Sequence, residues 1–484
     1  MSSAVSPSTE LLSRSDLDSI HSASIRVLEK VGVTIHDKAA LNLLQNSGAE
    51  IDMAKGRASI PESLISGSLA KAPRSITLHS INRKATFPLT GSNVYYSPGS
   101  TVPFILDLDG TVRTPTSSDL VNLVRLNDAL QNIQLQSTAL GVLSDIPDNI
   151  VDAYRLYLVL KNSQKPIMTG ALRTPGLRNM LGLLQIAAGG SEELARWPIA
   201  VFTATPTTPL AWEEFGIRTL SECGGAGIPV EIVPGPQLGI TSPSTIAGAL
   251  VQLNAEFLSG LVISQLTKAG APVIYGGVGA LFDMRYANAR CAAIESMMLV
   301  SAYAEMGKYY GFPTSTYSGH TDAKTIDAQS GYEAGVGIIL AALSGVNIVS
   351  GPGGMNFLYM QSLEKLVIDD AICGMARRLK RGISVNDETL AFDAIERAGP
   401  GGQFLGLKHT RDWVLQEQFM PSQVVDRQTL DGWKAKGSKG SAANAAEVGQ
   451  RILGQHKPEP LPVETEKLLD AAAKEIVRTG VLIA

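Results

Sequence analysis

The sequence contains few residues that could bind a metal ion through a recognisable motif. Its three cysteines, Cys223, Cys291 and Cys373, are far apart, and no CxxC, HExxH or HxH pattern occurs. Zinc sites usually show such short spacings, and disulfide frameworks use an even number of cysteines. We therefore expect reduced, half-buried cysteines and no metal bound by the protein itself.

A strong excess of charge of either sign is also missing. The formal net charge is -4 over 484 residues, which provides no electrostatic basis for binding nucleic acid or an anionic membrane. The first residues, MSSAVSPSTE, include no basic run followed by an apolar segment, as a secretory signal would. We expect a cytoplasmic protein that binds neither nucleic acid nor a membrane.

One long stretch carries no charge at all. Residues 334–360 lack any charged side chain, but Gly351 and Pro352 interrupt them and Asn347 dilutes their hydrophobicity. A membrane span needs about 20 predominantly apolar residues. A buried helix followed by a buried parallel strand therefore fits this stretch better.

Two nucleotide-binding fingerprints are absent, namely GxGxxG after the first predicted strand and GK[ST] after a glycine-rich loop. Instead, a β-rich run, a loop rich in Gly, Pro, Ser and Thr, and a helical pattern recur about every thirty to forty residues. The runs lie near Ile133, Ile167, Ile199, Val230, Val273, Thr314, Val346 and, more weakly, Ile383. About eight such units predict an α/β protein built on a TIM (β/α)8 barrel, with a doubly wound open sheet as the second possibility.

The barrel is expected to carry an addition at each end. Residues 1–92 predict an N-terminal mixed α/β cap, with a first helix capped by Ser13 or Ser15, further helices that start at Asp37 and Pro61, and two hairpins. Residues 93–398 are assigned to the barrel. Residues 399–484 predict a C-terminal helical extension that packs across the barrel or into a neighbouring subunit, so we expect a homo-oligomer.

The chemically richest stretch is Tyr317–Met360, which predicts one βαβ unit. In parallel α/β proteins the loops after the strands meet on one face, where active sites lie. After the first strand come His320, Asp322 and Lys324, and the helix adds Glu333. His320, Asp322 and Glu333 are the candidate catalytic residues, because they could transfer protons. No second histidine or activated serine stands nearby to complete a nucleophilic relay.

Aromatic residues near the predicted strand ends are the second notable set, in a chain with only 6% aromatics. Most will be ordinary core. Three or four rings around one cavity would bind a quaternary ammonium ion, at ~0.5–2 kcal/mol per ring. The candidate substrate-binding residues are Tyr95, Tyr96, Tyr317, Gly319, Gly353, Gly354, Asn356, Phe357 and Tyr359. Tyr95 and Tyr96 are expected in a turn that folds over the barrel mouth.

The segments TDAKTIDAQSGYEAG, VSGPGG, GPGGQFLGLKHTRDW and DRQTLDGWKAKG are similar to those of the trimethylamine methyltransferase superfamily, in the same order over nearly the whole chain. The resemblance implies a (β/α)8 barrel that hands a methyl group from an amine to the Co(I) of a corrinoid (cobalamin), carried by a small partner protein or supplied in trans. It also implies that His320, Asn356 or the N–H groups of Gly353 and Gly354 could hold a substrate carboxylate.

Two departures from the family pattern stand out. The archaeal trimethylamine enzymes carry pyrrolysine, which we place near the loop of residues 319–324, and this chain has only ordinary residues there. It therefore resembles the non-pyrrolysine branch, which includes enzymes for glycine betaine. Gln403 stands in the GGxFLG segment, where histidine is the more common residue.

Other functions stay open on the sequence alone. The preferred reading is a corrinoid-dependent methyltransferase for a small quaternary amine, such as glycine betaine or a related betaine. Trimethylamine or another methylamine is an alternative substrate. A barrel lyase or isomerase that uses Asp322, Glu333 and Lys324 for proton transfer is a different enzyme class, and a non-catalytic binder is a third possibility.

Overall fold

The structure is a computed structural model that describes residues 5–99 and 101–482. At its centre, eight short strands pair in parallel, each with the next. The series closes on itself, because the Leu135 N–H donates to the Tyr96 carbonyl at 2.9 Å. The strands are β6 (Tyr95–Ser97), β9 (Gln136–Ser137), β10 (Ile167–Thr169), β11 (Ala200–Ala204), β13 (Val230–Ile232), β15 (Val273–Gly277), β18 (Thr314–Thr316) and β19 (Ile348–Ser350). The predicted TIM barrel is confirmed.

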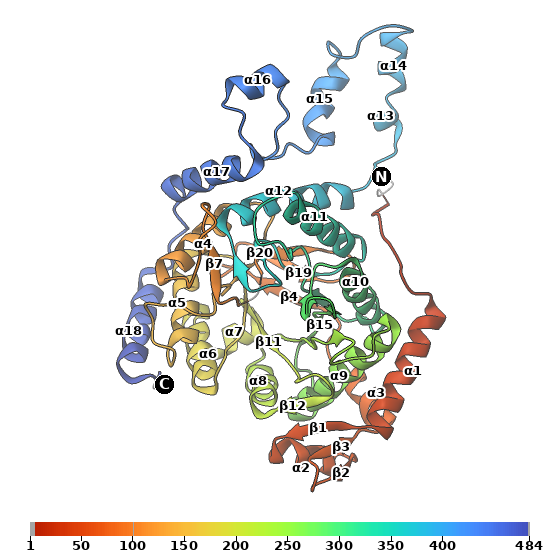
Figure 1. Cartoon of the computed structure of the whole chain (residues 1–484), viewed down its shortest axis with the longest axis vertical. Coiled ribbons are helices and arrows are strands. Elements are labelled where there is room, and N and C mark those ends of the chain that lie inside the picture. The colour runs from red at the N-terminus through yellow and green to blue at the C-terminus, as the bar shows by residue number, and fades with distance from the viewer. Residues whose placement is uncertain (1–4, 100, 483–484) are drawn as a thin grey trace.

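Eight helices surround these strands as a ring (Figure 1). The apolar faces of the helices and the outer faces of the strands share two large buried clusters, which form most of the core. The helices are α4 (Ser117–Ala129), α5 (Val151–Asn162), α6 (Thr174–Ala188), α8 (Glu214–Gly225), α9 (Ile246–Thr267), α10 (Ile294–Tyr309), α11 (Ala328–Leu343) and α12 (Leu363–Lys380), with the short α7 (Ser191–Arg196) after α6.

One predicted strand is wrong. Ile383 lies in a loop just after α12 and is 78% exposed, because the helix ends at Lys380 and Gly382 turns the chain with φ +69°. The missing barrel strand is β6, which pairs with β19 in parallel. Only three residues long, β6 has no run of β-branched side chains, and so it escapes a search for strand patterns.

The N-terminal section contains the expected mixture of helices and hairpins. Its helices are α1 (Arg14–Lys30), α2 (Lys38–Asn46) and α3 (Glu62–Lys71), and its strands are β1 (Val33–His36), β2 (Glu50–Asp52), β3 (Arg57–Ser59), β4 (Ile76–His79) and β5 (Thr86–Leu89). The two predicted hairpins, β2–β3 and β4–β5, are confirmed. Strand β1 also pairs with β12 (Ala211–Glu213), from the loop after β11.

The β4–β5 hairpin covers one end of the barrel. Leu78 and Leu89 of the hairpin form a buried cluster with Met168, Val201 and Ile274 of the barrel strands. Because Tyr95 at the start of β6 packs on the same cluster, this is the amino end of the strands. The opposite, carboxyl end is therefore the open one.

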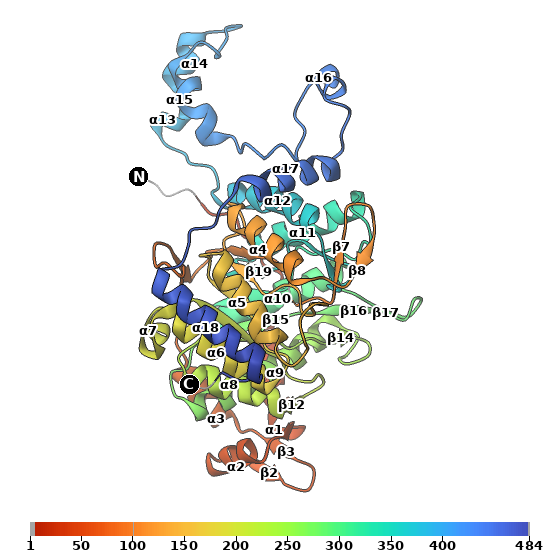
Figure 2. The same cartoon turned by 90° about the vertical axis from the view of Figure 1, so that its left-hand side faces the viewer.

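Two small sheets rise around the carboxyl end, on one side of the molecule in Figure 2. One contains β7 (Phe104–Leu106), β8 (Val112–Arg113), β20 (Gly354–Met355) and β21 (Met360–Gln361), and the other contains β14 (Gln237–Leu238), β16 (Ala280–Asp283) and β17 (Asn288–Arg290). These additions to the strand-end loops form the walls around the barrel mouth.

The C-terminal section has two parts that differ in packing. Helices α13 (Asp387–Leu390), α14 (Phe392–Ala398), α15 (Lys408–Glu417) and α16 (Leu430–Ala435) contain no buried residue and project from the barrel wall (Figures 1 and 2). Helix α17 (Ser441–Gln455) packs on α12 and α4, and α18 (Val463–Thr479) packs on α5 and α6. Packing across the barrel is thus confirmed for α17 and α18, whereas contact with a second subunit stays a prediction.

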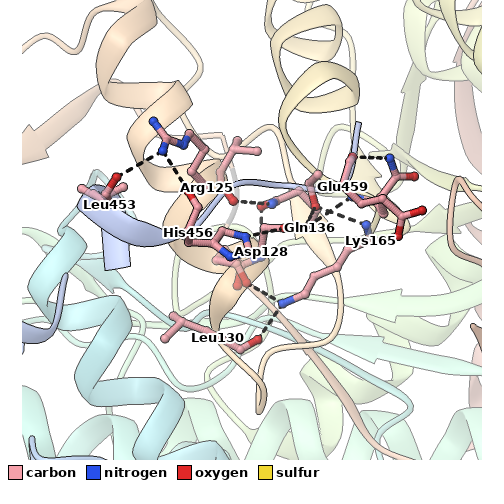
Figure 3. A network of polar contacts seen from close by, with 12 residues as sticks. Arg125, Asp128, Leu130, Gln136, Lys165, Leu453, His456 and Glu459 are labelled. Atoms are coloured by element: carbon pink, nitrogen blue, oxygen red, sulfur yellow. Dashed lines mark hydrogen bonds and ion pairs between the residues drawn. The ribbon is translucent and has the colours of Figure 1, made fainter. Parts of the chain in front are cut away.

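A polar network fixes the link between α17 and α18 to the barrel (Figure 3). Arg125 donates to the carbonyls of Leu453 and His456, and the His456 ring lies 2.8 Å from Asp128. Beside them the half-buried Lys165 donates to three carbonyls at the end of α4 and just beyond it, and desolvation of its ammonium group lowers its pKa to about 8. The link is therefore held at its α17 end, and in its middle the Glu459 carbonyl accepts from the Gln164 side chain at 2.7 Å.

One helix, α9, is long and apolar enough to cross a membrane by composition alone. In the structure 78% of its apolar window is buried among other elements. A core helix of a barrel explains the same composition, so the helix is weak support for a membrane span.

Candidate active site

A cavity of about 330 Å³ opens among the carboxyl ends of the barrel strands. We call it the inner cavity. Its volume is that of a site for a small molecule. The lining residues are Pro98, Thr101, Ser137, Met168, Thr169, Gly170, Ala171, Leu172, Thr203, Ala204, Thr205, Phe215, Gly216, Thr219, Tyr317 and Ser350. They come from the ends of four strands (β9, β10, β11 and β19), from loops that include those after β6 and β18, and from helix α8, as expected for a barrel active site.

Glu231 lies just behind this lining and is fully buried in the middle of β13. Its carboxylate accepts hydrogen bonds from Thr203 at 2.6 Å, Ser315 at 2.6 Å and Tyr317 at 3.2 Å. Within the described residues no lysine, arginine or histidine forms an ion pair with it. Burial raises the pKa of Glu231, and the three hydroxyl groups oppose this rise. A buried carboxylate without a cation is costly, so it suggests a positively charged ligand nearby.

Polar groups on another part of the wall complete the cavity. The buried Ser350 hydroxyl has no hydrogen-bond partner within the described chain. Behind the wall, the buried Arg155 guanidinium lies 3.5 Å from the Thr101 hydroxyl and donates to the Gly170 carbonyl at 3.3 Å. Its charge is balanced by Asp152, 2.8 Å away. The wall can therefore offer hydroxyl groups to an anionic part of a ligand.

A second cavity, of about 620 Å³, lies beside the β16–β17 hairpin and the start of α11. We call it the rim cavity. Its lining residues are Asp283, Tyr286, Asn288, Ala289, Arg290, Ala293, Asp322, Lys324, Gln329, Glu333, Asn356 and Phe357. Four of the predicted site residues, Asp322, Glu333, Asn356 and Phe357, thus meet here and not in the inner cavity.

The loops after β18 and β19 pack closely against each other. A Cβ atom on Gly351 would collide with the Ser318 carbonyl, so only glycine fits at this crossing. Gly319 has a φ of +86°, in the left-handed region that favours glycine. Gly319 and Gly351 therefore allow the two loops to approach each other, and neither residue lines the inner cavity or the rim cavity.

The N–H groups of Gly353 and Gly354 are not free for a substrate. Gly353 N–H donates to Asp369 at 2.7 Å, and Gly354 N–H donates to the Gly351 carbonyl at 2.9 Å. Asp369 is itself paired with Lys365 inside the protein. The prediction that this turn binds a carboxylate is wrong, because its donors are already used to hold the loop on α12.

Glu333 ties the His320 loop to α11. Its carboxylate accepts from the Thr321 hydroxyl and from the Asp322 N–H at 2.8 Å, and Gln329 donates to its other oxygen at 2.9 Å. Asp322 in turn accepts from the Ala292 N–H at 3.1 Å. Burial raises the pKa of Asp322 to about 6. Glu333 therefore positions the loop, whereas Asp322 could exchange a proton near neutral pH.

His320 is only 3% exposed, and neither of its ring nitrogens has a hydrogen-bond partner in the described chain. Burial lowers its pKa to about 4, so the ring is neutral at physiological pH. The Cys291 sulfur, a His320 ring nitrogen and an Asp322 oxygen all lie within 4.8 Å of one another. Burial also raises the pKa of the Cys291 thiol, to about 12.

The predicted aromatic cage is not assembled. Of the aromatic residues predicted for the cage, Tyr317 alone is among the described residues that line the inner cavity. Phe357 lies in the rim cavity, where the Lys324 ammonium sits 3.9 Å from its ring centroid, and Tyr359 is 57% exposed. Asn356 and Phe357 both have φ near +50 to +60° (49° and 59°), an uncommon conformation for residues other than glycine.

The expectation that Tyr95 and Tyr96 lie in a turn over the barrel mouth is wrong. Both belong to strand β6 and not to a turn over the mouth. Tyr95 packs edge-on against Phe87 at the amino end, with ring centroids 5.5 Å apart. Tyr96 is fully buried between β6 and the surrounding helices. Neither ring can reach a ligand at the barrel mouth.

Three important residues escaped the sequence reasoning. Thr203 and Phe215 belong to the third predicted unit and Glu231 to the fourth. Most of the predicted site residues belong to the sixth and seventh units. One signal was available for Glu231, which stands alone among apolar residues in the strand sequence PVEIV. A charged residue in the middle of a buried strand is rare unless it has a partner or a function.

The comparisons with known proteins agree with this architecture. The family model described as trimethylamine methyltransferase (MTTB) matches residues 3–477. The glycine betaine methyltransferase of Desulfitobacterium hafniense (strain Y51) is 32% identical over 466 residues, covering 96% of this chain and 96% of that protein. The trimethylamine methyltransferase MttB of Methanosarcina thermophila is 30% identical over 466 residues, covering 95% of this chain and 96% of that one.

Among solved structures, the Methanosarcina barkeri monomethylamine methyltransferase MtmB is similar in fold. It has a TM-score of 0.51 and 11% sequence identity, covering 97% of this chain and 88% of that one. At this identity the likeness supports the barrel fold alone. The family match and the relatives at 30% and 32% identity extend along almost the whole chain, so this barrel protein is a methyltransferase and belongs to the trimethylamine methyltransferase family.

Proposed function

We propose that the protein transfers a methyl group from a small quaternary amine, glycine betaine or a related betaine, to the Co(I) of a corrinoid carried by a partner protein. The observation that carries this proposal is Glu231, a buried carboxylate beneath the inner cavity without a cationic partner among the described residues. The 32% identity to a glycine betaine methyltransferase supports the choice of amine.

A quaternary ammonium group has no N–H to donate, so a protein must bind it through charge, ring faces and apolar contacts. Glu231 supplies the charge, and the Tyr317 ring and the apolar side chains of Met168 and Phe215 supply contacts. Because Glu231 is buried, its attraction to a bound cation is stronger than it would be in bulk solvent.

The opposite wall suits the carboxylate of a betaine. Ser350 and Thr101 present hydroxyl groups, and the buried guanidinium of Arg155 stands behind Thr101. A zwitterion would therefore lie with its ammonium group toward Glu231 and its carboxylate toward the hydroxyl groups. Trimethylamine has no carboxylate and would leave this second set of contacts unused.

The residues present fit a corrinoid only as an acceptor brought by another protein. A cavity of about 330 Å³ suits a small amine, whereas a corrin ring with its side chains is much larger. The corrinoid, when bound, supplies the nucleophile that takes the methyl group. The C–N electron pair stays on the departing amine, which needs no proton from the protein.

What this chain contributes is binding, orientation and exclusion of water. The positive charge on nitrogen declines as the C–N bond breaks, so Glu231 interacts more strongly with the substrate than with the transition state. Its removal should raise KM more than it lowers kcat. The rate must come instead from holding one methyl carbon in line with the acceptor in a dry cavity.

The test is methyl transfer to free Co(I) cobalamin from a panel of methylated amines, followed by the absorbance of methylcobalamin. At least one quaternary compound should react, and trimethylamine should react little. Faster turnover of trimethylamine than of every betaine would refute the quaternary substrate. An isomerised or cleaved product without methylcobalamin would favour the lyase or isomerase alternative.

A further inference from the structure

Three potential metal ligands converge although they are separated in the sequence. Cys291 directly follows β17, and His320 and Asp322 lie in the loop after β18. One donor atom from each, a sulfur, a nitrogen and an oxygen, lies within 4.8 Å of the other two. The fold-back of the β16–β17 hairpin brings Cys291 to this loop.

The surroundings of His320 within the protein do not explain why this polar ring is buried. The ring is buried, and neither nitrogen makes a hydrogen bond of good geometry in the described residues, although the nearby Cys291 backbone acts to raise the ring pKa. Leaving a buried polar group unsatisfied costs roughly 1–3 kcal/mol, and native proteins rarely contain such groups. A ligand on one nitrogen would remove most of that cost.

The chemical types of the three donor atoms indicate which metal ion they would bind. Thiolate, imidazole and carboxylate together are typical of zinc, whereas calcium and magnesium prefer oxygen alone. Donor atoms around a tetrahedral zinc lie ~3.5 Å apart, so the three side chains need to close by roughly an ångström at most. A thiolate and a carboxylate also carry the two negative charges that balance a divalent cation.

The surroundings hold the ligands in place. The Asp322 carboxylate accepts from the Ala292 N–H at 3.1 Å, while the Asp322 N–H is held by Glu333 at 2.8 Å. Such second contacts orient the ligands of metal sites. Asp322 also lines the rim cavity, which provides an entry path for an ion.

We propose that Cys291, His320 and Asp322 bind one divalent transition-metal ion, zinc by preference, with a fourth position open toward the rim cavity. On binding, the Cys291 thiol loses its proton to solvent, and the sulfur becomes the ligand. The sequence-based expectation of no metal rested on spacing along the chain, and the convergence of these ligands depends on the fold. This proposal is independent of the methyl donor assigned above.

The experiment uses the full-length protein after dialysis against a chelator, without any corrinoid. Zinc is added, excess metal is removed by gel filtration, and the retained metal is measured by mass spectrometry. We expect one zinc per chain. In a parallel titration with free Co²⁺, the protein should develop a thiolate-to-cobalt charge-transfer band in the near ultraviolet, which reports the sulfur ligand directly.

Three variants and one control complete the test. Cys291→Ser should abolish the charge-transfer band, and His320→Gln should lower the metal affinity at least tenfold; Asp322→Asn should weaken binding less. Cys223→Ser, which changes a buried cysteine on α8, should retain metal and band like the wild type. Zinc should raise the Tm of the wild type and of this control but not of Cys291→Ser.

The outcomes are decisive in both directions. Failure of the wild type to retain zinc after gel filtration would overturn the proposal. Binding that survives in both Cys291→Ser and His320→Gln would also overturn it, because the metal would then lie elsewhere. Circular dichroism of each variant before metal addition excludes loss of fold as the cause.

Discussion

The inner cavity and the rim cavity both open at the carboxyl end of the barrel, but they differ in how their charges are arranged. In the rim cavity Asp283 and Lys324 are engaged by neighbouring side chains, while Asp322 and Glu333 accept hydrogen bonds from loop residues and from Gln329. Asp283 forms ion pairs with Arg285 and Arg290, and Lys324 lies over the Phe357 ring. The inner cavity is backed by Glu231, which no cation of the described chain neutralises.

The rim cavity has more charged residues in its lining than the inner cavity, but the number of charged residues is a poor guide to where a cationic substrate binds. A charge that is compensated by its neighbours has little to offer a ligand. An uncompensated buried charge gains much from one, because the ligand removes the cost of burial. We therefore propose that the cationic substrate binds in the inner cavity, and this proposal can be tested one residue at a time.

The largest effect is expected for Glu231→Gln. The substitution keeps the shape but removes the charge, so affinity for the quaternary amine should fall by about 30- to 100-fold, equivalent to about 2–3 kcal/mol. Calorimetric titration with the wild type and the variant measures this loss. Asp283→Asn, which removes a paired charge from the rim cavity, serves as control and should change the affinity little. Equal losses in both variants would contradict the assignment.

The second effect concerns pH. Burial raises the pKa of Glu231 above its ordinary value. The cation requires the ionised carboxylate, so affinity should be full above this raised pKa and should fall as the pH drops through it. Titrations over a range of pH would show the fall in the wild type. In Glu231→Gln this pH dependence should disappear, and its persistence would show that another group is responsible.

A smaller effect is expected at Tyr317, which both lines the inner cavity and donates to Glu231. Tyr317→Leu removes the ring face and should weaken binding of the cation by ~1–2 kcal/mol. Tyr317→Phe keeps the ring and should lose less. A neutral isostere, with carbon in place of nitrogen, should bind the wild type more weakly and should be affected less by the leucine substitution. Identical affinities for all three proteins would show that the ring is only structural.

The smallest effect should come from Phe357→Leu. The face of this ring is occupied by Lys324, at 3.9 Å from the centroid, and is not offered to a ligand. We expect less than a twofold change in amine affinity and a loss of stability of about 0.5–1 kcal/mol. Thermal unfolding and titration together check both numbers. If the variant loses as much affinity as Tyr317→Leu, the rim cavity holds the amine instead.

The barrel could be predicted because its repeating unit can be recognised from residues that are close together in the sequence. Seven of its strands are preceded or followed by runs rich in Gly and Pro, and most contain β-branched residues, so the period is visible without any tertiary information. Strand β6 breaks the pattern with the sequence YYS, since its place in the sheet comes from β19 and from the Leu135 N–H. Partners supplied by distant residues cannot be seen in a local pattern.

The site could be predicted only in part, for a related reason. The His320 loop was correctly placed at a strand end, because strand and loop are adjacent in the sequence. Two features depend on the packed molecule: Glu231 has no cationic partner among the described residues, and Cys291 lies beside His320. Aromatic residues were misjudged because Tyr96 could equally well point outward to the helices, and the alternation of a strand decides that direction.

The position of β6 has a consequence for how the protein is made. Its neighbour β19 leaves the ribosome roughly 250 residues later, which corresponds to about 12 to 50 seconds at ordinary rates of synthesis. During that interval one edge of β6 has no partner. The inner cavity is lined from both strand ends, by Pro98 after β6 and Ser350 of β19, so it cannot exist before the barrel closes. A nascent chain therefore acquires the inner cavity, the proposed substrate site, only after nearly three quarters of its length has been translated.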